Sequence, residues 1–209
     1  MVSPIACLQI SKIEQGMFTK FRTPFTMSML LRLFRPAPEP IQHPVYPNHM
    51  GAGCVFTDGR HILAGYQPHK KRPGITGIGG HKEGSETYLE TAYRETLEEL
   101  FHVTQLPLGL IPRLVQTMRP RNYKMKKGYV MLFFNFEDLL QLLTLSRKAG
   151  LRSPLYPRWP KTLLELLQLR GSDLKAEIAI LCLLPVVHHT GKSKDFVNPY
   201  FIDDLRSLI

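Results

Sequence analysis

The chain has 209 residues, 44% of them hydrophobic, which is enough apolar material for one domain with a buried core and excludes wholesale disorder. Its formal net charge of +10 favours polyanionic partners such as nucleotides, nucleic acid or an anionic membrane surface. No apolar run reaches the roughly 18 residues that a bilayer-spanning helix needs, so no transmembrane segment is expected.

The three cysteines, Cys7, Cys54 and Cys182, lie far apart and form no CxxC pair, so neither a zinc site nor a disulfide framework is indicated. Unpaired thiols are typical of a reducing compartment, so we expect a cytoplasmic protein. Residues 12–35 carry five Lys or Arg against one acid, a pattern that a weak mitochondrial leader or a basic arm shares. A solvated extension is the favoured interpretation, with mitochondrial or nuclear placement as the alternative.

Residues 1–48 are predicted to be an N-terminal extension and linker. Five prolines fall in residues 36–47, and proline excludes both a helix interior and a central strand. The main domain is therefore predicted to cover residues 49–209.

The first predicted elements are two strands around a tight turn. Cys54–Phe56 and His61–Gly65 flank Asp58-Gly59, a dipeptide that is a strong signal for a hairpin turn. The glycine-rich stretch that follows is interpreted as loop, with a short strand at Ile75–Ile78. The pattern thus predicts that the first two strands pair with each other.

A helix is predicted over Tyr88–Phe101, which contains no Gly or Pro and is rich in Glu, Leu and Ala. Ser85 or Glu86 is expected to open it, and acidic side chains near its start suit the positive end of the helix dipole.

The second half of the chain is predicted to alternate irregularly between strands and helices. The basic stretch 119–128 is interpreted as the connection between two strands, and Trp159 as a packing anchor. Such alternation predicts an α/β fold, a sandwich with a mixed sheet. The predicted strands are Leu110–Met118, Tyr129–Phe136 and Ile178–Val187, and the predicted helices are Glu137–Lys148, Lys161–Leu169 and Tyr200–Leu208.

Three carboxylates, Glu95, Glu98 and Glu99, stand at i, i+3 and i+4 on the predicted helix and therefore share one face. Like charges at that spacing destabilise an isolated helix. A bound cation is the obvious compensation, and carboxylate oxygens suit Mg²⁺ or Mn²⁺. Arg94 is placed to pair with a carboxylate and orient it. Taken alone, the three charges fit a solvated helix face better.

Glycines lie immediately upstream, at Gly77, Gly79 and Gly80, where they allow the backbone to approach a phosphate or to offer a carbonyl to a metal. A glycine-rich loop that leads into an acidic helix predicts a metal–diphosphate site and metal-assisted hydrolysis. His81 follows the loop and is a weaker candidate for a phosphate contact.

The spacing of the whole segment resembles the Nudix box. That motif reads Gly, five residues, Glu, seven residues, Arg-Glu, an aliphatic, any residue, Glu-Glu, any residue, Gly and an aliphatic. All six defining positions up to the second Glu of the Glu-Glu pair match in identity and spacing. The resemblance implies a Nudix-like α/β/α sandwich with a mixed sheet. The matching residues are Gly80, Glu86, Arg94, Glu95, Glu98 and Glu99.

The same resemblance implies roles for these residues. Arg94 and Glu86 would brace the loop-helix-loop, and Glu98 or Glu99 would activate water. The implied ligands of Mg²⁺ or Mn²⁺ are the carbonyl of Gly80 and the carboxylates of Glu95, Glu98 and Glu99.

The sequence departs from the motif at three positions. Thr96 replaces an aliphatic, which is a mild change. Phe101 stands where the motif has the Gly that ends the helix in a left-handed conformation, and His102 stands at the next aliphatic. We therefore expect the helix to run longer or to close differently, and a weakened enzyme is one consequence.

Two features outside the motif are candidates for substrate recognition. Glu177, which precedes a long apolar run, is the candidate for a further metal-binding carboxylate, and a surface glutamate is an equal alternative. The basic connection could bind phosphates and stack a base, or could be a solubilising turn. Its candidate residues are Arg119, Arg121, Tyr123, Lys124, Lys126 and Lys127.

Three functions follow, in order of preference. The first is a pyrophosphohydrolase that cuts a phosphoanhydride bond in a nucleoside diphosphate-linked substrate. The second is an RNA decapping enzyme of the same fold, which the basic balance favours. The third is a nucleotide- or RNA-binding module with little turnover. The pair His188-His189 is interpreted as a polar strand end, because adjacent strand residues face opposite sides.

Overall fold

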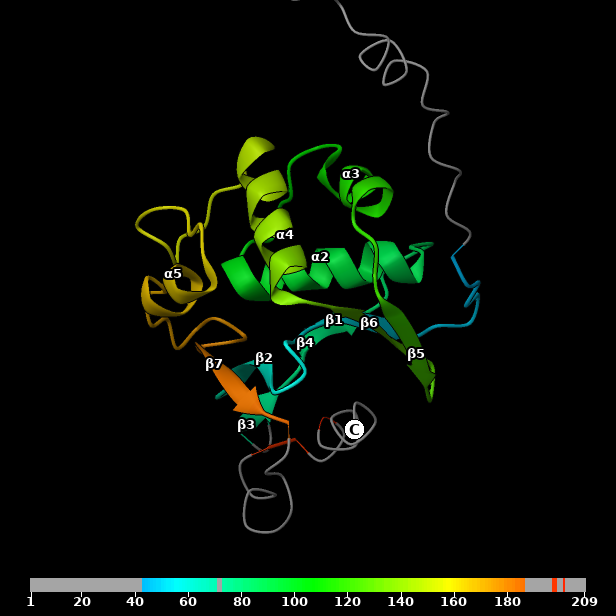
Figure 1. Cartoon of the computed structure of the whole chain (residues 1–209), viewed down its shortest axis with the longest axis horizontal. Coiled ribbons are helices and arrows are strands. Elements are labelled where there is room, and N and C mark those ends of the chain that lie inside the picture. Colours follow the sequence, from blue (N-terminus) through cyan, green and yellow to red (C-terminus); the bar gives the residue numbers. More distant parts are fainter. Residues whose placement is uncertain (1–42, 71–72, 187–196, 199–200, 202–209) are drawn as a thin grey trace, which may run out of the picture. The chain divides into compact units, whose positions relative to one another are not determined.

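The computed structural model describes residues 43–70, 73–186, 197–198 and 201 (Figure 1). The described residues from Val45 onward belong to one compact unit. The predicted extension of residues 1–48 falls almost wholly outside the described part and stays a prediction. Among the described residues, no helix is both long and apolar enough to cross a membrane.

Two sheets form the centre of the unit. One has the strand order β4-β1-β6-β5 and the other the order β3-β2-β7. Strand β1 runs parallel to β6 and antiparallel to β4, so the predicted mixed sheet is confirmed. The strands are β1 (Gly51–Phe56), β2 (His61–Gln67), β3 (Gly74–Thr76), β4 (Ile78–His81), β5 (Asn122–Lys126), β6 (Tyr129–Phe134) and β7 (Ile180–Pro185).

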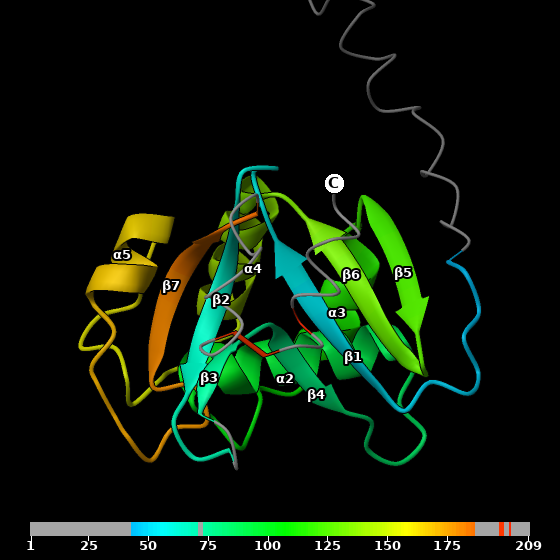
Figure 2. The ribbon, with the colours of Figure 1, turned by 90° about the horizontal axis from the view of Figure 1, so that it is seen from below.

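Helices α2, α3 and α4 lie on one side of the four-stranded sheet, and α5 lies beyond β7 (Figures 1 and 2). The α/β fold class is thus confirmed. The predicted helix Tyr200–Leu208 falls outside the described residues except for Phe201. The helices are α2 (Tyr88–Phe101), α3 (Leu110–Thr117), α4 (Phe136–Lys148) and α5 (Leu163–Gln168).

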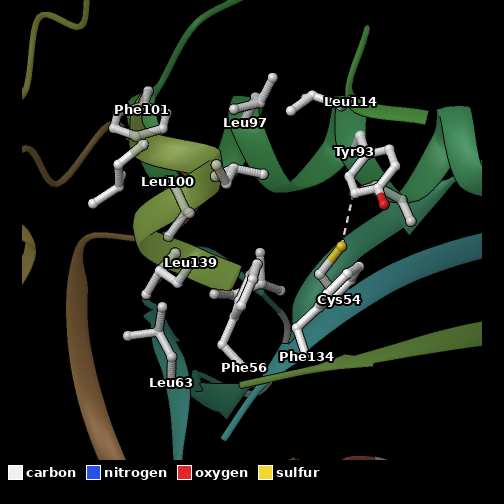
Figure 3. Close-up of a cluster of buried hydrophobic side chains, with 14 of the residues drawn as sticks. Cys54, Phe56, Leu63, Tyr93, Leu97, Leu100, Phe101, Leu114, Phe134 and Leu139 are labelled. Atoms are coloured by element: carbon white, nitrogen blue, oxygen red, sulfur yellow. Dashed lines mark hydrogen bonds between the residues drawn. The ribbon is translucent and has the colours of Figure 1, made fainter. Parts of the chain in front are cut away.

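The main core lies between α2 and the four-stranded sheet (Figure 3). Alternate residues of β1 point toward the helix, among them Cys54 and Phe56, which are buried as expected for an apolar strand. Phe56 stacks on Phe134 of β6 at 5.5 Å between ring centroids. Tyr93 projects from α2 onto this layer, with its ring centroid 6.1 Å from that of Phe134. Packing therefore fixes the helix to the sheet along its apolar face and leaves the acidic face for the site.

The predicted hairpin between the first two strands is wrong. Asp58 does make the expected tight turn, because its Oδ1 accepts hydrogen bonds from the amides of Arg60 and His61. However, β1 already has β4 on one edge and β6 on the other, so it has no free edge for β2. After one isolated bridge between Thr57 and Ile62, the two strands join different sheets.

The predicted strand Leu110–Met118 is also wrong, since these residues form α3. Leu110, Leu114 and Met118 are buried at a spacing of four residues, which is a helical period that the β-branched neighbours obscured. Pro112 is tolerated because it lies in the first turn, where no intrahelical amide partner is lost.

The other elements agree with the predictions to within a few residues. Helix α2 has the predicted bounds, and α4, α5, β6 and β7 are displaced by one or two residues at their ends. The predicted strand Ile75–Ile78 is split at Gly77 into β3 and β4, which belong to different sheets. The basic connection 119–128 is not all loop, because β5 lies inside it.

Candidate active site

The start of α2 is fixed by a capping box. The hydroxyl of Thr87 accepts from the amide of Glu90, and the carboxylate of Glu90 accepts from the amide of Thr87. The N-cap is therefore Thr87 and not the predicted Ser85 or Glu86. This cap ends the loop that leaves β4, so the glycines of β4 and the acidic face of α2 are held next to each other.

Arg94 lies at the centre of the loop and helix. Its Nε donates to Glu86 Oε1 at 2.7 Å, and its Nη2 donates to the carbonyl of His81 at 2.7 Å. Its Nη1 donates to Glu95 Oε1 at 3.0 Å and to Glu98 Oε2 at 2.9 Å. Although burial opposes it, these partners raise the pKa of the guanidinium, so Arg94 stays charged. One buried cation thus ties the loop to two of the helix carboxylates.

Glu86 takes part in the same network from the loop. Its Oε2 accepts from the hydroxyl of Thr91 at 3.0 Å as well as from Arg94. Partial burial works in the opposite direction, but the hydrogen bonds from Arg94, from the amide of Glu83 and from Thr91 hold the pKa of Glu86 below its usual value. Glu86 is therefore ionised and braces the loop against the helix.

Glu99 is the most deeply buried carboxylate of the helix, with 5% of its surface exposed. Its Oε2 accepts from the amide of Gly79 at 2.6 Å, and its Oε1 accepts from Gln67 Nε2 at 3.2 Å. Burial raises the pKa of Glu99 well above its usual value, although the Gly79 amide opposes that shift. Burial also raises the pKa of Glu95 and of Glu98, with Arg94 as the opposing charge.

Glu177 joins this group from the start of the chain segment that enters β7. Its Oε1 accepts from Gln67 Nε2 at 3.2 Å and lies 2.9 Å from Lys70 Nζ. A single amide group of Gln67 therefore bridges the carboxylates of Glu99 and Glu177. The structure brings the predicted outlying carboxylate together with the helix glutamates.

The helix carboxylates Glu95, Glu98 and Glu99 line, together with Glu177, a pocket of about 650 Å³, here called the acidic pocket. Glu83, which belongs to the loop, lines it too and was missed by sequence reasoning. Gln67 and Lys70 also line the pocket. They were missed as well, because they lie at the end of β2 and just after it, far in the sequence from the helix. The five glutamates of the acidic pocket are Glu83, Glu95, Glu98, Glu99 and Glu177.

A second pocket of about 510 Å³, here called the sheet pocket, adjoins the first over β1, β4 and β6. The two pockets share Lys70, Glu95 and Glu177 among their lining residues. The volume of the sheet pocket falls within the range of small-molecule sites. The residues that line only the sheet pocket include Gly53, Gly79, Gly80, His81, Lys126, Lys127, Tyr129, Met131 and Phe201.

The predicted basic connection is divided by the structure. Lys126 and Lys127 line the sheet pocket, whereas Arg119, Arg121, Tyr123 and Lys124 line neither pocket. Arg119 donates to the main-chain carbonyls of Val115 and Met118 at the end of α3, and Arg121 lies 3.5 Å from Asp138. Tyr123 packs edge-on against Tyr88 in the core, so its ring is not placed for stacking on a base.

Lys127 adopts the left-handed backbone conformation, with φ of 49°, and so does the following Gly128, with φ of 79°. Two consecutive residues of that kind form the tight turn typical of a hairpin, here between β5 and β6. The pair His188-His189 lies outside the described residues. Trp159 packs on the core as predicted, with its Nε1 donating to the carbonyl of Leu143.

The donor set fits a hard divalent cation, because all the charged acceptors of the acidic pocket are carboxylate oxygens. Gly80 supports this fit, since a Cβ there would collide with the carboxylate of Glu95. Among the described residues, no three Asp, Glu, His or Cys side chains already converge on one metal position. The guanidinium of Arg94 instead neutralises Glu95 and Glu98 in this structure.

The end of α2 departs from the motif as expected. The helix runs to Phe101, and the left-handed residue is His102, with φ of 51° and ψ of 56°. Phe101 is fully buried and stacks on Trp159 at 4.4 Å. Thr96 is buried like the aliphatic residue that it replaces. The helix therefore closes one residue later than the motif predicts, and all the acidic residues precede that point.

Comparisons with known proteins give structural similarity only. No protein-family model and no curated protein matches the sequence. A bifunctional NMN adenylyltransferase/ADP-ribose pyrophosphatase from Francisella tularensis, complexed with AMP and a manganese ion, superposes with a TM-score of 0.45 and 15% identity. That match covers 79% of this chain but only 42% of the other protein.

Two Nudix hydrolases are similar at lower scores. The one from Nitrosomonas europaea gives a TM-score of 0.38 with 13% identity, over 77% of this chain and 87% of that one. The one from Clostridium perfringens gives a TM-score of 0.36 with 12% identity, over 77% of this chain and 95% of that one. Because all three TM-scores are below 0.5, the case for a function rests on the residues of the two pockets.

Proposed function

We propose that this chain is a Mg²⁺- or Mn²⁺-dependent pyrophosphohydrolase of the Nudix type that cleaves a phosphoanhydride bond in a nucleoside diphosphate-linked substrate. One observation carries the proposal: five glutamates line a pocket that opens into a second pocket bearing Lys126 and Lys127. Carboxylates to hold cations and lysines to hold phosphates are what this reaction requires.

The residues that would hold the metal are Glu95, Glu98 and Glu99, with the carbonyl of Gly80 and the carboxylate of Glu177. When bound there, the metal neutralises phosphate charge and lowers the pKa of a water molecule.

Glu98 is the better placed of the two candidate general bases. Its side chain is 28% exposed, and it interacts with Arg94 through Oε2. Both oxygens of Glu99 instead accept hydrogen bonds, from Gln67 and from Gly79, in a buried position. We therefore assign proton abstraction from water to Glu98, in addition to the metal ligation that the three helix carboxylates share, and metal ligation alone to Glu99.

The remaining residues position the substrate. Lys70, Lys126 and Lys127 lie around the two pockets and would hold the phosphates. Tyr129 and Met131 provide an apolar wall on which a nucleoside would rest. Arg94 and Glu86 hold β4 and α2 in place relative to each other and would not contact the substrate.

RNA decapping is the second candidate. The register of β5 with β6 pairs Lys124 with Met131 and Lys126 with Tyr129, so both lysines stand on the sheet face that bears the sheet pocket. A row of cations on an edge strand beside the pocket suits a longer polyanion, as does the net charge of +10.

A binding module with little turnover is the third candidate. The observation in its favour is that Arg94 already compensates Glu95 and Glu98, so their charges alone do not require a metal. The five glutamates of the acidic pocket still outnumber Arg94 and the two lysines of its lining, Lys70 and Lys175, and that excess of negative charge favours the hydrolase.

A substrate panel with Mg²⁺ or Mn²⁺ separates these functions. It contains nucleoside triphosphates, ADP-ribose, dinucleoside polyphosphates and cap-labelled RNA. We expect hydrolysis of a nucleoside diphosphate-linked compound, and release of a capped nucleotide diphosphate from RNA alone would select decapping. Absence of turnover together with tight RNA binding would select the module.

Two matched variants accompany the panel. Glu98→Gln and Glu99→Gln should each remove most activity while the protein stays folded. Glu90→Gln, on the same helix but outside both pockets, should keep its activity because glutamine also completes a capping box. Unchanged activity in both pocket variants would refute the assigned roles.

A further inference from the structure

Helix α2 closes at the left-handed residue His102, and side chains distant in the sequence bond its last carbonyl groups. The last turn holds no basic residue, and Phe101 occupies the position at which the motif has glycine. The last carbonyls of a helix have no partner within it and need one from elsewhere. Here the partners come from residues about 50 and 70 positions later in the sequence.

Arg170 supplies most of these partners. Its Nη1 donates to the carbonyl of Leu100, and its Nη2 donates to the carbonyl of Glu99 at 3.1 Å. Separately, the hydroxyl of Ser153 donates to the carbonyl of Phe101 at 2.5 Å. A guanidinium at this end is also favourable because the helix dipole is negative there.

The same guanidinium reaches the segment that carries the outlying carboxylate. Its Nη2 donates to the carbonyl of Ile178 at 2.6 Å, and Ile178 directly follows Glu177. Arg170 lies over the ring of Tyr156, with 5.9 Å between the guanidinium carbon and the ring centroid. One half-buried side chain thus bonds the main chain at Glu99 and beside Glu177.

Gln67 connects the same two glutamates through their side chains, with 3.2 Å to each carboxylate. The backbones are therefore joined by Arg170 and the carboxylates by Gln67. A loss of the backbone link would let α2 and the entry to β7 move apart, and a carboxylate displaced by about 1 Å is a poor ligand.

We propose that Arg170 is a positioning residue that sets the location of Glu99 relative to Glu177 and so shapes the acidic pocket. It lines neither the acidic pocket nor the sheet pocket. Its effect on metal binding and turnover rests on the proposed function, whereas its effect on the position of Glu99 does not.

The test uses full-length protein and Mn²⁺ alone as the probe. Arg170→Met removes all the donors, and Arg170→Lys keeps the charge but not the planar group that reaches three carbonyls. We expect Mn²⁺ affinity to fall about tenfold or more in Arg170→Met, the usual effect of removing a group that orients metal ligands. Arg170→Lys should fall between it and the parent.

Two controls separate positioning from stability. Arg158→Met removes an exposed guanidinium that pairs with Glu165 in the same segment. Ser153→Ala removes the other cap of α2 but leaves Glu99 and Glu177 in place. Both should keep the parental Mn²⁺ affinity within about twofold, although Ser153→Ala lowers the melting temperature.

A measurement on the metal-free protein keeps the two proposals distinguishable. The amide of Gly79 donates to Glu99, so its hydrogen exchange reports whether that carboxylate is in place. The Gly79 amide should exchange faster in Arg170→Met than in the parent, and at the parental rate in Ser153→Ala. If Arg170→Met does not fold, the faster exchange is expected in Arg170→Lys. Parental exchange in the folded Arg170 variants would overturn the inference. A parent that binds no Mn²⁺ would overturn the proposed function alone.

Discussion

Gly80 determines where the carboxylate of Glu95 can lie. A Cβ at this position would meet Oε2, Cδ and Oε1 of Glu95, all at the end of a flexible side chain. The backbone of Gly80 is not in the left-handed region, so alanine is sterically compatible with the main chain. The glycine is therefore required by its neighbour and not by its own conformation.

Gly80→Ala should reduce activity more than stability. The added methyl group would push the Glu95 carboxylate out of place, and we expect at least about a tenfold fall in kcat with a small change in melting temperature. Steady-state kinetics and thermal unfolding of the same preparation measure both quantities.

Gly84→Ala is the matched control. Gly84 has φ of 51° and no neighbour within reach of a new Cβ. Alanine should cost about 1 kcal/mol of stability through backbone strain and leave kcat unchanged. If both alanine variants lose activity to the same extent, the effect at Gly80 does not come from Glu95.

At the scale of elements, the end of α2 is shaped by its contacts with the segment 151–170. Phe101 stacks on Trp159, and the carbonyls around it are bonded by Ser153 and Arg170. The sequence motif places glycine at residue 101 because a local turn normally ends this helix. Here the left-handed residue comes one position later, at His102, and partners distant in the sequence bond the last carbonyls. No local pattern could have predicted those partners.

Restoring the motif should therefore harm the protein. Phe101→Gly removes a fully buried aromatic side chain and should lower the free energy of unfolding by at least about 3 kcal/mol without raising activity. His102→Gly should be neutral or stabilising by up to about 1 kcal/mol, because His102 already has a left-handed backbone. Urea unfolding of both variants checks this contrast, and a stable, more active Phe101→Gly would contradict it.

The turn at Asp58 gives a pH-dependent stability. Hydrogen bonds from the amides of His61 and Arg60 lower the pKa of Asp58 from 3.8 to about 2. The folded state therefore binds fewer protons than the unfolded state in that range, and the stabilisation is lost as the pH falls through it. Asp58→Asn has no such charge to lose.

Thermal unfolding of the parent and of Asp58→Asn across this range tests the turn. We expect the difference in melting temperature to be largest above pH 3.8 and to shrink toward pH 2. A difference that stays constant with pH would mean that the carboxylate charge does not stabilise the turn.

At the scale of the whole molecule, sequence and structure agree where a signal is local. Helix α2, its acidic face and the glycines before it lie within one short segment, so spacing alone located them. Strand pairing depends on which strand edges are free. The residues of β1 do not indicate that it lies between β4 and β6, so its predicted pairing with β2 failed. The lining by Gln67 and Lys70, at the end of β2 and just after it, escaped prediction for the same reason, whereas Glu83 was missed because it stands at none of the defining positions of the motif.

The basic connection 119–128 shows that net charge alone does not predict which cations line the site. A surplus of cations predicted anionic partners, yet of the six candidates in the basic connection only Lys126 and Lys127 line a pocket. Whether a cation faces the site depends on the alternation along β5 and on the turn that follows it, which the fold decides.

The most direct test of the account is a calorimetric titration with Mn²⁺ of the parent protein and of Glu98→Gln, with Glu90→Gln as the control. We predict that the parent binds Mn²⁺, that Glu90→Gln binds it equally well, and that Glu98→Gln binds it at least about tenfold more weakly. A parent that binds no Mn²⁺, or an affinity that Glu98→Gln leaves unchanged, would contradict the account.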